Sequence, residues 1–266
     1  MLSLRQITGG LPATNTKRKT WPIRQPNLAP TENAISEEAY YRMGRSFLCT
    51  SMNLMLDVDI RWHAPLPEGP KILVANHPTS LDPFYIQVLL SEPVSVLITA
   101  AAFEVPVFGA YLQATGHIPA VRGSGGTTVE AVVRRVEAGR SVAIFPEGAL
   151  SPLGGGFQRP HSGVARVALR TGAPVIPVGI GLQQEHIRVT KTSKDGENVI
   201  GHLYTSGPYA MTVGQPLYFE GDVLDRERVR SAARQIMHHI RNLAYESECR
   251  ISPAQGVEAA ILPAQG

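Results

Sequence analysis

Cysteine is scarce in this chain, whose 266 residues include only Cys49 and Cys249. Two cysteines so far apart support neither a disulfide framework nor a Cys-x-x-Cys metal site, so we expect two buried thiols. Long apolar runs are missing as well. The longest uncharged apolar stretch, Val94 to Phe103, is about half of the ~20 residues that a bilayer-spanning helix needs. The sequence therefore predicts no transmembrane helix. It also lacks the apolar block of a secretory signal, which favours a cytoplasmic protein.

A strong excess of charge of one sign is also absent. The formal net charge is +3, with 18% charged and 43% hydrophobic residues. This balance is typical of a globular protein and excludes a wholly disordered chain, a collagen or a long coiled coil. A duplex-binding surface needs a dense stripe of lysine and arginine, so we expect no nucleic-acid partner. Anionic lipid or a phosphorylated small molecule fits the mild positive charge better.

The chain divides into one domain and two tails. Residues 1–35 predict a disordered basic tail, residues 36–251 a single domain, and residues 252–266 a flexible tail. The domain begins with a predicted amphipathic helix over residues 36–56, because Ser36 can cap its start and apolar residues recur with helical spacing. The apolar face comprises Tyr40, Met43, Phe47 and Leu54, widened by Tyr41, Leu48, Met52 and Met55. Packing on the core and contact with a membrane both account for this face.

Short apolar runs alternate with helical patterns along the rest of the domain. An edge strand is predicted at 57–62, and buried strands at 71–75, 94–99, 141–145 and 175–180. Helices are predicted at 127–138 and 164–171, a hairpin at 187–192 and 199–205, one more strand at 211–213, and a closing amphipathic helix from residue 225. This alternation predicts an α/β fold with a mainly parallel mixed sheet flanked by helices.

The loop after the run 71–75 carries the first candidate site. In open parallel sheets, ligands bind beyond the carboxyl ends of the strands. Asn76 and His77 follow this run, and Asp82 comes just before Pro83, which suits the first position of a helix. A carboxylate five positions after a histidine can bind one ring nitrogen and leave the other free to accept a proton. The alternative is that Asp82 is only a helix cap.

Two further loops carry charged residues. Arg122 follows Gly116 and precedes a glycine-rich segment at the start of a predicted helix, which suits a phosphate ligand; a solvated turn is the alternative. Glu147 and Gly148 lie in a tight turn at the end of the run 141–145, where the carboxylate could hold Arg122 or a substrate hydroxyl. Residues 175–178 carry no chemistry of their own and are expected to shape the wall of a pocket.

Together these four segments resemble the glycerophospholipid acyltransferase family, of the 1-acylglycerol-3-phosphate acyltransferase type. The family's blocks NHxxxxD, GxIxxxR, FPEG and VxPV occur here in that order, and the resemblance covers roughly residues 60–217. It implies that His77 is the general base, Asp82 its orienting carboxylate and Arg122 the ligand of the acceptor's phosphate. The remaining substrate-binding residues implied by the resemblance are Asn76, Ser80, Gly116, Glu147 and Gly148.

The chain also departs from the family's pattern on the acceptor side. Residues 99–102 lack the basic residue that often precedes the second block, and Leu150 and Gln158 stand where many members carry arginine and lysine. Each departure removes a positive charge, which Arg159 and His161 could replace. The phosphate assignment therefore depends on fewer residues than the acyl-transfer assignment.

The resemblance implies transfer of a fatty acyl group from acyl-CoA or acyl carrier protein to a lysophospholipid, with no metal and no other cofactor. The preferred acceptor is 1-acylglycerol 3-phosphate, which would give phosphatidic acid. No serine or cysteine lies in a nucleophile motif such as GxSxG, which favours direct attack by the acceptor. We also expect peripheral contact with the cytoplasmic face of a membrane. The alternatives are another acceptor (glycerol 3-phosphate, an amino-lipid or water) and a non-catalytic lipid-binding protein on the same fold.

Overall fold

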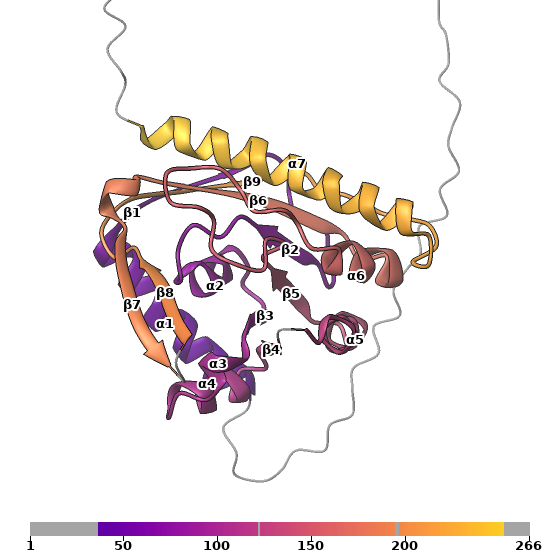
Figure 1. The fold of residues 1–266 in the computed structure, drawn as a ribbon, viewed down its shortest axis with the longest axis horizontal. Coiled ribbons are helices and arrows are strands. Elements are labelled where there is room, and N and C mark those ends of the chain that lie inside the picture. The colour runs from indigo at the N-terminus through magenta and orange to yellow at the C-terminus, as the bar shows by residue number, and fades with distance from the viewer. Residues whose placement is uncertain (1–36, 122, 195–196, 253–266) are drawn as a thin grey trace, which may run out of the picture.

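A seven-stranded sheet forms the centre of the protein in this computed structural model (Figure 1). The structure describes residues 37–121, 123–194 and 197–252. Apart from Ser252, the two predicted tails lie outside these residues, as does Arg122.

The order of the strands in the sheet is β1-β9-β6-β2-β5-β3-β4. The strands β6, β2, β5, β3 and β4 are parallel to one another, whereas β9 pairs antiparallel with β6 and carries β1 at the edge. The predicted α/β fold with a mainly parallel mixed sheet is therefore confirmed. The bounds are β1 (Leu56–Trp62), β2 (Ile72–Ala75), β3 (Val94–Thr99), β4 (Ile118–Ala120), β5 (Ser141–Ile144), β6 (Val175–Leu182) and β9 (Gly207–Val213). A separate hairpin consists of β7 (Arg188–Lys194) and β8 (Glu197–Leu203).

Helices cover both faces of the sheet, which is why its central strands are apolar on both sides. In β2, Ile72 and Val74 pack with one group of helices, and Leu73 and Ala75 pack with the other. The first group is α5 (Gly125–Glu137), α6 (Gly163–Thr171) and α7 (Arg226–Ile251), the last of which crosses β6 and β9 (Figure 1). The second group is α1 (Glu37–Met55), α2 (Asp82–Tyr85), the 3-10 turn η1 (Ile86–Leu89) and α4 (Phe108–Ala114). Two further short turns are α3 (Ala100–Phe103) and η2 (Gln184–His186).

The sequence missed the shortest elements and misjudged the cysteines. The elements α3, α4 and β4 span only three to seven residues, too few to show a hydrophobic period, whereas the helix start expected at Asp82 and Pro83 is observed as α2. Cys49 is half-buried and Cys249 is exposed, so the prediction of two buried thiols is wrong. Cys249 lies on the outward side of α7, opposite the side that packs on the sheet.

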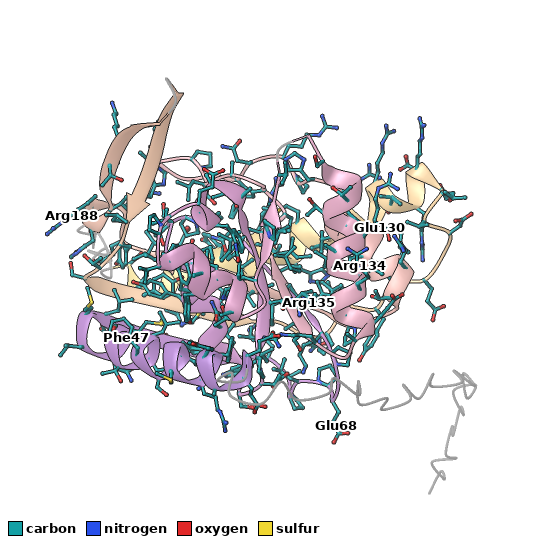
Figure 2. All side chains as sticks on the ribbon, turned by 90° about the horizontal axis from the view of Figure 1, so that it is seen from below. Phe47, Glu68, Glu130, Arg134, Arg135 and Arg188 are labelled. Carbon is teal, nitrogen blue, oxygen red and sulfur yellow. The ribbon has the colours of Figure 1, made fainter. Side chains whose placement is uncertain are left out.

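The predicted N-terminal helix is confirmed as α1, and its apolar surface divides between two environments. Tyr41 and Met52 are buried, and Leu48 packs against the core. On the outer side, Phe47 is 77% exposed and Leu54 is 84% exposed. Figure 2 shows α1 along the rim of the molecule, with Phe47 labelled. The helix thus covers the core and also presents an apolar stripe, which comprises Tyr40, Met43, Phe47 and Leu54.

Candidate active site

The candidate site lies where β2 and β5 end side by side. The two strands are parallel neighbours, with Val74 opposite Ile144, so the loops that follow them leave the sheet at the same edge. His77 comes from the first loop and Glu147 from the second. The pairing of the strands therefore brings together two residues that are 70 positions apart in the chain.

His77 and Asp82 form the predicted pair. The Nδ1 atom of His77 lies 3.1 Å from Oδ2 of Asp82, and the side chain of His77 is 17% exposed whereas that of Asp82 is fully buried. An ionised carboxylate only accepts hydrogen bonds, so this contact places the proton of a neutral imidazole on Nδ1. Among the described residues no hydrogen bond to Nε2 of His77 is found. That nitrogen can therefore accept a proton from a bound alcohol.

Asp82 is held by more than the histidine. Its Oδ2 also accepts the backbone N–H of Thr79 at 2.7 Å, and its Oδ1 accepts the hydroxyls of Thr79 and Tyr209, each at 2.8 Å. Burial, followed by the charge of Asp82, raises the pKa of Tyr209 well above its usual value, so this phenol keeps its proton and donates. The interpretation of Asp82 as a helix cap is wrong, because Leu81 occupies the N-cap position of α2 without a side-chain cap bond.

Glu147 holds the main chain of His77 instead of its ring. Its Oε1 accepts the backbone N–H of His77 at 3.1 Å and the hydroxyl of Ser151 at 2.6 Å, while its Oε2 accepts the N–H of Gln158 at 2.6 Å. The residue is only 2% exposed. Both carboxylate oxygens thus bind the protein itself, and the contact with Arg122 or a substrate hydroxyl stays a prediction.

The imidazole of His77 also stacks on Phe145, the residue that follows β5. The two ring centroids are 4.4 Å apart with an interplanar angle of 28°. This contact fixes the plane of the ring, and the hydrogen bond to Asp82 fixes its rotation within that plane. The tight turn after β5 thus supplies both a wall for the histidine and the carboxylate of Glu147 for its backbone.

Asn76 and Ser80 use their polar atoms within the protein. The amide of Asn76 donates to the carbonyl of Ile180 and accepts its N–H, at 2.8 and 2.7 Å, which ties the loop to β6. The hydroxyl of Ser80 accepts the N–H of His202 in β8 at 3.1 Å. The structure thus gives both residues a positioning role where substrate contact was predicted.

Gly116 does not join the other predicted residues. It precedes β4, so it lies at the amino end of a strand that is parallel to β2, whereas His77 lies beyond a carboxyl end. A Cβ added at Gly116 would lie 2.2 Å from a carboxylate oxygen of Glu37, which shows how closely α1 packs there. The structure therefore does not bring Gly116 together with His77, and its role in substrate binding stays a prediction. Arg122 lies outside the described residues, so its place at the site stays a prediction.

His117, beside Gly116, is a core residue. It is 4% exposed, and its Nδ1 accepts the backbone N–H of Val96 at 3.1 Å. Burial, assisted by the positive charges of Arg140 and Arg135, lowers the pKa of His117 to about 4. This histidine is therefore neutral at pH 7.

Gly148 closes the turn after Glu147 in a left-handed conformation, with φ of +64°. A Cβ at this position would lie 2.7 Å from the ring of His161. Gly148 and His161 are both exposed. Gly148 is therefore a predicted binding residue that a substrate could reach from solvent, next to the loop of His77.

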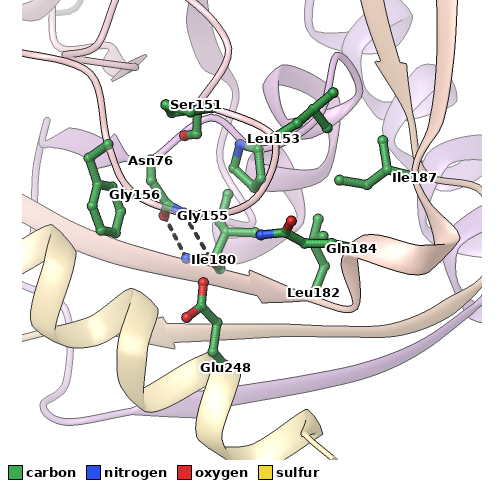
Figure 3. Close-up of a pocket in the computed structure, with 13 residues that line it drawn as sticks. Asn76, Ser151, Leu153, Gly155, Gly156, Ile180, Leu182, Gln184, Ile187 and Glu248 are labelled. Atoms are coloured by element: carbon green, nitrogen blue, oxygen red, sulfur yellow. Dashed lines mark hydrogen bonds between the residues drawn. The ribbon is translucent and has the colours of Figure 1, made fainter.

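A small pocket lies beside this loop, between β6, α7 and residues 151–157 (Figure 3). Asn76 and Pro78 belong to its lining, whereas His77 does not. Glu248 of α7 points toward it in Figure 3, and burial raises the pKa of this carboxyl group. Within the described part of the chain, no cluster of three histidine, cysteine or acidic residues could hold a metal ion.

The comparisons with known proteins agree with this arrangement. The sequence model of the acyltransferase family matches residues 57–181, a range that contains His77, Asp82 and Glu147. Over this range the chain is similar to the acyltransferase family. The matched range ends within β6, so Tyr209 and the hairpin lie beyond it. No curated protein matches the sequence.

A solved structure shares the fold of this protein. It is the crystal structure of the 1-acyl-sn-glycerophosphate (LPA) acyltransferase PlsC from Thermotoga maritima. The TM-score is 0.53 at 18% sequence identity, over 76% of this chain and 80% of that chain. At this identity the likeness establishes a common fold, which includes elements outside the matched family range.

Sequence reasoning missed three residues that shape the site. Thr79 lies inside the motif, three positions before Asp82, and its hydroxyl was a signal that could have been used. Ser151 follows Glu147 by four residues but belongs to no recognised block. Tyr209 is 127 positions from Asp82, and nothing in the sequence connects the two.

Proposed function

We propose that this protein transfers a fatty acyl group from a thioester, on coenzyme A or on acyl carrier protein, to the hydroxyl of a lysophospholipid. The observation that carries the proposal is the buried Asp82 carboxylate bound to Nδ1 of His77, whose other nitrogen has no hydrogen-bonding partner among the described residues. The family gives the reaction type, and the geometry gives residues that can perform it. The preferred acceptor is 1-acylglycerol 3-phosphate, with phosphatidic acid as the product.

The reaction would proceed by direct attack. Nε2 of His77 removes the proton of the acceptor hydroxyl as its oxygen bonds to the thioester carbonyl carbon. The carbon–sulfur bond then breaks, and the imidazolium returns the proton to the leaving thiolate, so that a thiol and an ester are released. Asp82 stabilises the imidazolium between the two steps. No step requires a metal or a further cofactor.

The experiment that tests this function is a screen of donors and acceptors with purified protein, read by lipid mass spectrometry. The donors are acyl-CoA and acyl carrier protein thioesters. The acceptors are 1-acylglycerol 3-phosphate, glycerol 3-phosphate, a lyso amino-lipid, and water alone. An acylated lipid that disappears in the His77→Ala protein supports the proposal. Hydrolysis without an acylated product would show a thioesterase, and binding of lipid without turnover of any donor would show a lipid-binding protein.

Arg122 would bind the phosphate of the acceptor. This residue lies outside the described part of the chain, so its assignment depends on the sequence block alone. Arg122→Ala should raise the KM for 1-acylglycerol 3-phosphate more than it lowers kcat, and Arg122→Lys should rescue it poorly because lysine lacks the planar pair of donors. An unchanged KM in Arg122→Ala would remove this residue from the site.

We further propose that the protein binds the cytoplasmic face of a membrane peripherally, through the apolar stripe of α1 and the basic residues of the tail 1–35. Both substrate and product partition into bilayers, and the exposed side chains of Met43, Phe47 and Leu54 suit the boundary of the acyl chains. No helix within residues 37–121, 123–194 and 197–252 is long and apolar enough to cross a bilayer.

Flotation with anionic liposomes tests this attachment. Met43→Ser combined with Phe47→Ser should reduce binding strongly, whereas Leu224→Ser, a change at an equally exposed residue ahead of α7, should not. Leu48 is unsuitable for the test because it packs on the core. If the wild-type protein stays in the soluble fraction at low salt, the attachment is wrong.

A further inference from the structure

We propose that Tyr209 is a positioning residue for the His77–Asp82 pair: its phenol fixes the Asp82 carboxylate relative to the sheet, so that the carboxylate can orient the imidazole. This inference rests on the proposed function, because it assigns the pair a catalytic role. It concerns a residue of β9, beyond the range that the family model matches.

The hydrogen bonds of Asp82 divide into local and distant ones. Thr79 supplies two donors, its N–H and its hydroxyl, and His77 supplies the third. All three come from the same short loop, so they hold the carboxylate within the loop but do not hold it against the rest of the molecule. Among the described residues Tyr209 gives the carboxylate its only distant hydrogen bond, from 127 positions away at 2.8 Å.

Tyr209 is itself placed rigidly. It is fully buried, in a strand that lies between β1 and β6. Its ring packs edge-on against that of Tyr85, with centroids 5.2 Å apart, and Tyr85 belongs to the same short helix as Asp82. The phenol therefore meets Oδ1 without the cost of ordering a free side chain on substrate binding.

The same part of the chain also holds the loop by its backbone. In β8, the carbonyl of His202 accepts the N–H of Ser80 at 2.8 Å, and Nδ1 of His202 lies 3.1 Å from the carbonyl of Pro78. The segment after β6 thus contacts the histidine loop on both sides of Thr79. The loop that carries the pair is positioned by residues on two strands that the four sequence blocks do not include.

Loss of the phenol would change both geometry and charge. Without this donor the buried carboxylate has one hydrogen bond fewer, and it can rotate away from His77. A carboxylate that has turned away also stabilises the imidazolium less. Removal of the hydroxyl should therefore lower the rate and move the acidic limb of the pH–rate profile to lower pH.

The test compares Tyr209→Phe with Tyr204→Phe. Tyr204 is an equally buried neighbour whose ring lies 6.1 Å from that of Tyr209, but its hydroxyl donates to the carbonyl of Pro208. We expect Tyr209→Phe to lower kcat about tenfold with little change in KM, and to shift the acidic limb. Tyr204→Phe should leave both unchanged. The effect of Tyr209→Phe should also be much smaller in an Asp82→Asn background, because the phenol acts through that carboxylate.

A purely structural role would give a different result. In that case Tyr209→Phe would lower the melting temperature but leave kcat and the pH profile as in wild type, or would add its full effect to that of Asp82→Asn. Either outcome overturns the proposal, as would an equal loss of kcat in Tyr204→Phe.

A readout without turnover separates this proposal from the proposed function. Nitrogen-15 NMR of the histidines, with His77 assigned from a His77→Gln spectrum, reports which ring nitrogen carries the proton. We expect the Nδ1–H form in wild type and a loss or shift of that signal in Tyr209→Phe. If no donor and acceptor react, the proposed function fails. The role of Tyr209 fails separately, if the His77 signal in Tyr209→Phe is the same as in wild type.

Discussion

Asp82 and Glu147 are two buried carboxylates that hold the same histidine in different ways. Asp82 accepts a bond from the imidazole, and Glu147 accepts one from the backbone N–H of His77. Both have every oxygen bound within the protein, and both are almost completely inaccessible. The comparison separates two roles: one carboxylate sets the proton and rotation of the ring, and the other sets where the loop lies.

The surroundings of the two carboxylates explain the difference. Asp82 is the first residue of α2, which directly follows the loop of His77, so its side chain can turn back toward that loop. Glu147 belongs to the turn after β5, and its oxygens connect that turn to Ser151, to Gln158 and to the neighbouring strand end. Removal of Glu147 would leave the donors of His77, Ser151 and Gln158 without this acceptor, whereas removal of Asp82 would release the ring of His77 together with Thr79 and Tyr209.

The largest expected effect falls on the ring and its carboxylate. His77→Ala should lower kcat by ~10²–10⁴, the usual cost of losing a general base, and Asp82→Asn should lower it less. Both proteins should fold. The measurement is acyl transfer followed by mass spectrometry, with His238→Ala as a control at an exposed histidine of α7. A folded His77→Ala protein with wild-type turnover would show that His77 is not the general base, so Asp82 would have no catalytic ring to orient.

Glu147→Gln should affect stability before chemistry. An amide in place of the carboxylate turns an N–H group toward one of three donors, so a buried hydrogen bond is lost, at a cost of about 1–3 kcal/mol in the free energy of unfolding. Chemical denaturation measures this, with the exposed Glu137→Gln as the matched control. If Glu147→Gln were as stable as wild type and as inactive as Asp82→Asn, the two carboxylates would share one role.

His117, a second buried histidine, should make the stability of the protein depend on pH. The pKa of His117 is lowered to about 4 in the folded protein, below its unfolded value, so the unfolded state binds more protons as the pH falls. Its contribution to stability is therefore present above pH 6.5 and is lost on acidification, by up to about 2 kcal/mol at pH 5. Denaturation of wild type and His117→Gln at pH 7 and pH 5 measures it. An equal loss in the two proteins would show that other groups cause the pH dependence.

The smallest effect is expected at Gly148, next to Glu147. Gly148→Ala places a side chain at φ of +64° and against the ring of His161. We expect a loss of about 1 kcal/mol in the free energy of unfolding. His161→Ala in the same protein should recover only the part that is due to the contact with the ring. Full recovery in the double variant would mean that the backbone conformation contributes nothing.

Much of the fold was predictable, because strands that are buried on both faces of the sheet appear in the sequence as short continuous apolar runs. The strand predicted at 94–99 is observed as β3, and the helix predicted at 164–171 as α6 within one residue. β4 and α4 were missed because three to seven residues show no period. The position of Gly116 before β4 was not predicted, because a block of sequence does not reveal which end of its strand each residue occupies.

Local sequence patterns predict the α/β class, the order of the longer strands and helices along the chain, and the pair His77 and Asp82. These follow from local patterns: hydrophobic period, a turn with proline, and five positions between a base and its carboxylate. Three contacts become visible only in the folded protein: Glu147 binds the backbone of His77, Asn76 binds β6, and Tyr209 binds Asp82. Each of these contacts joins residues at least 70 positions apart, and the pairing of strands in the sheet brings them together.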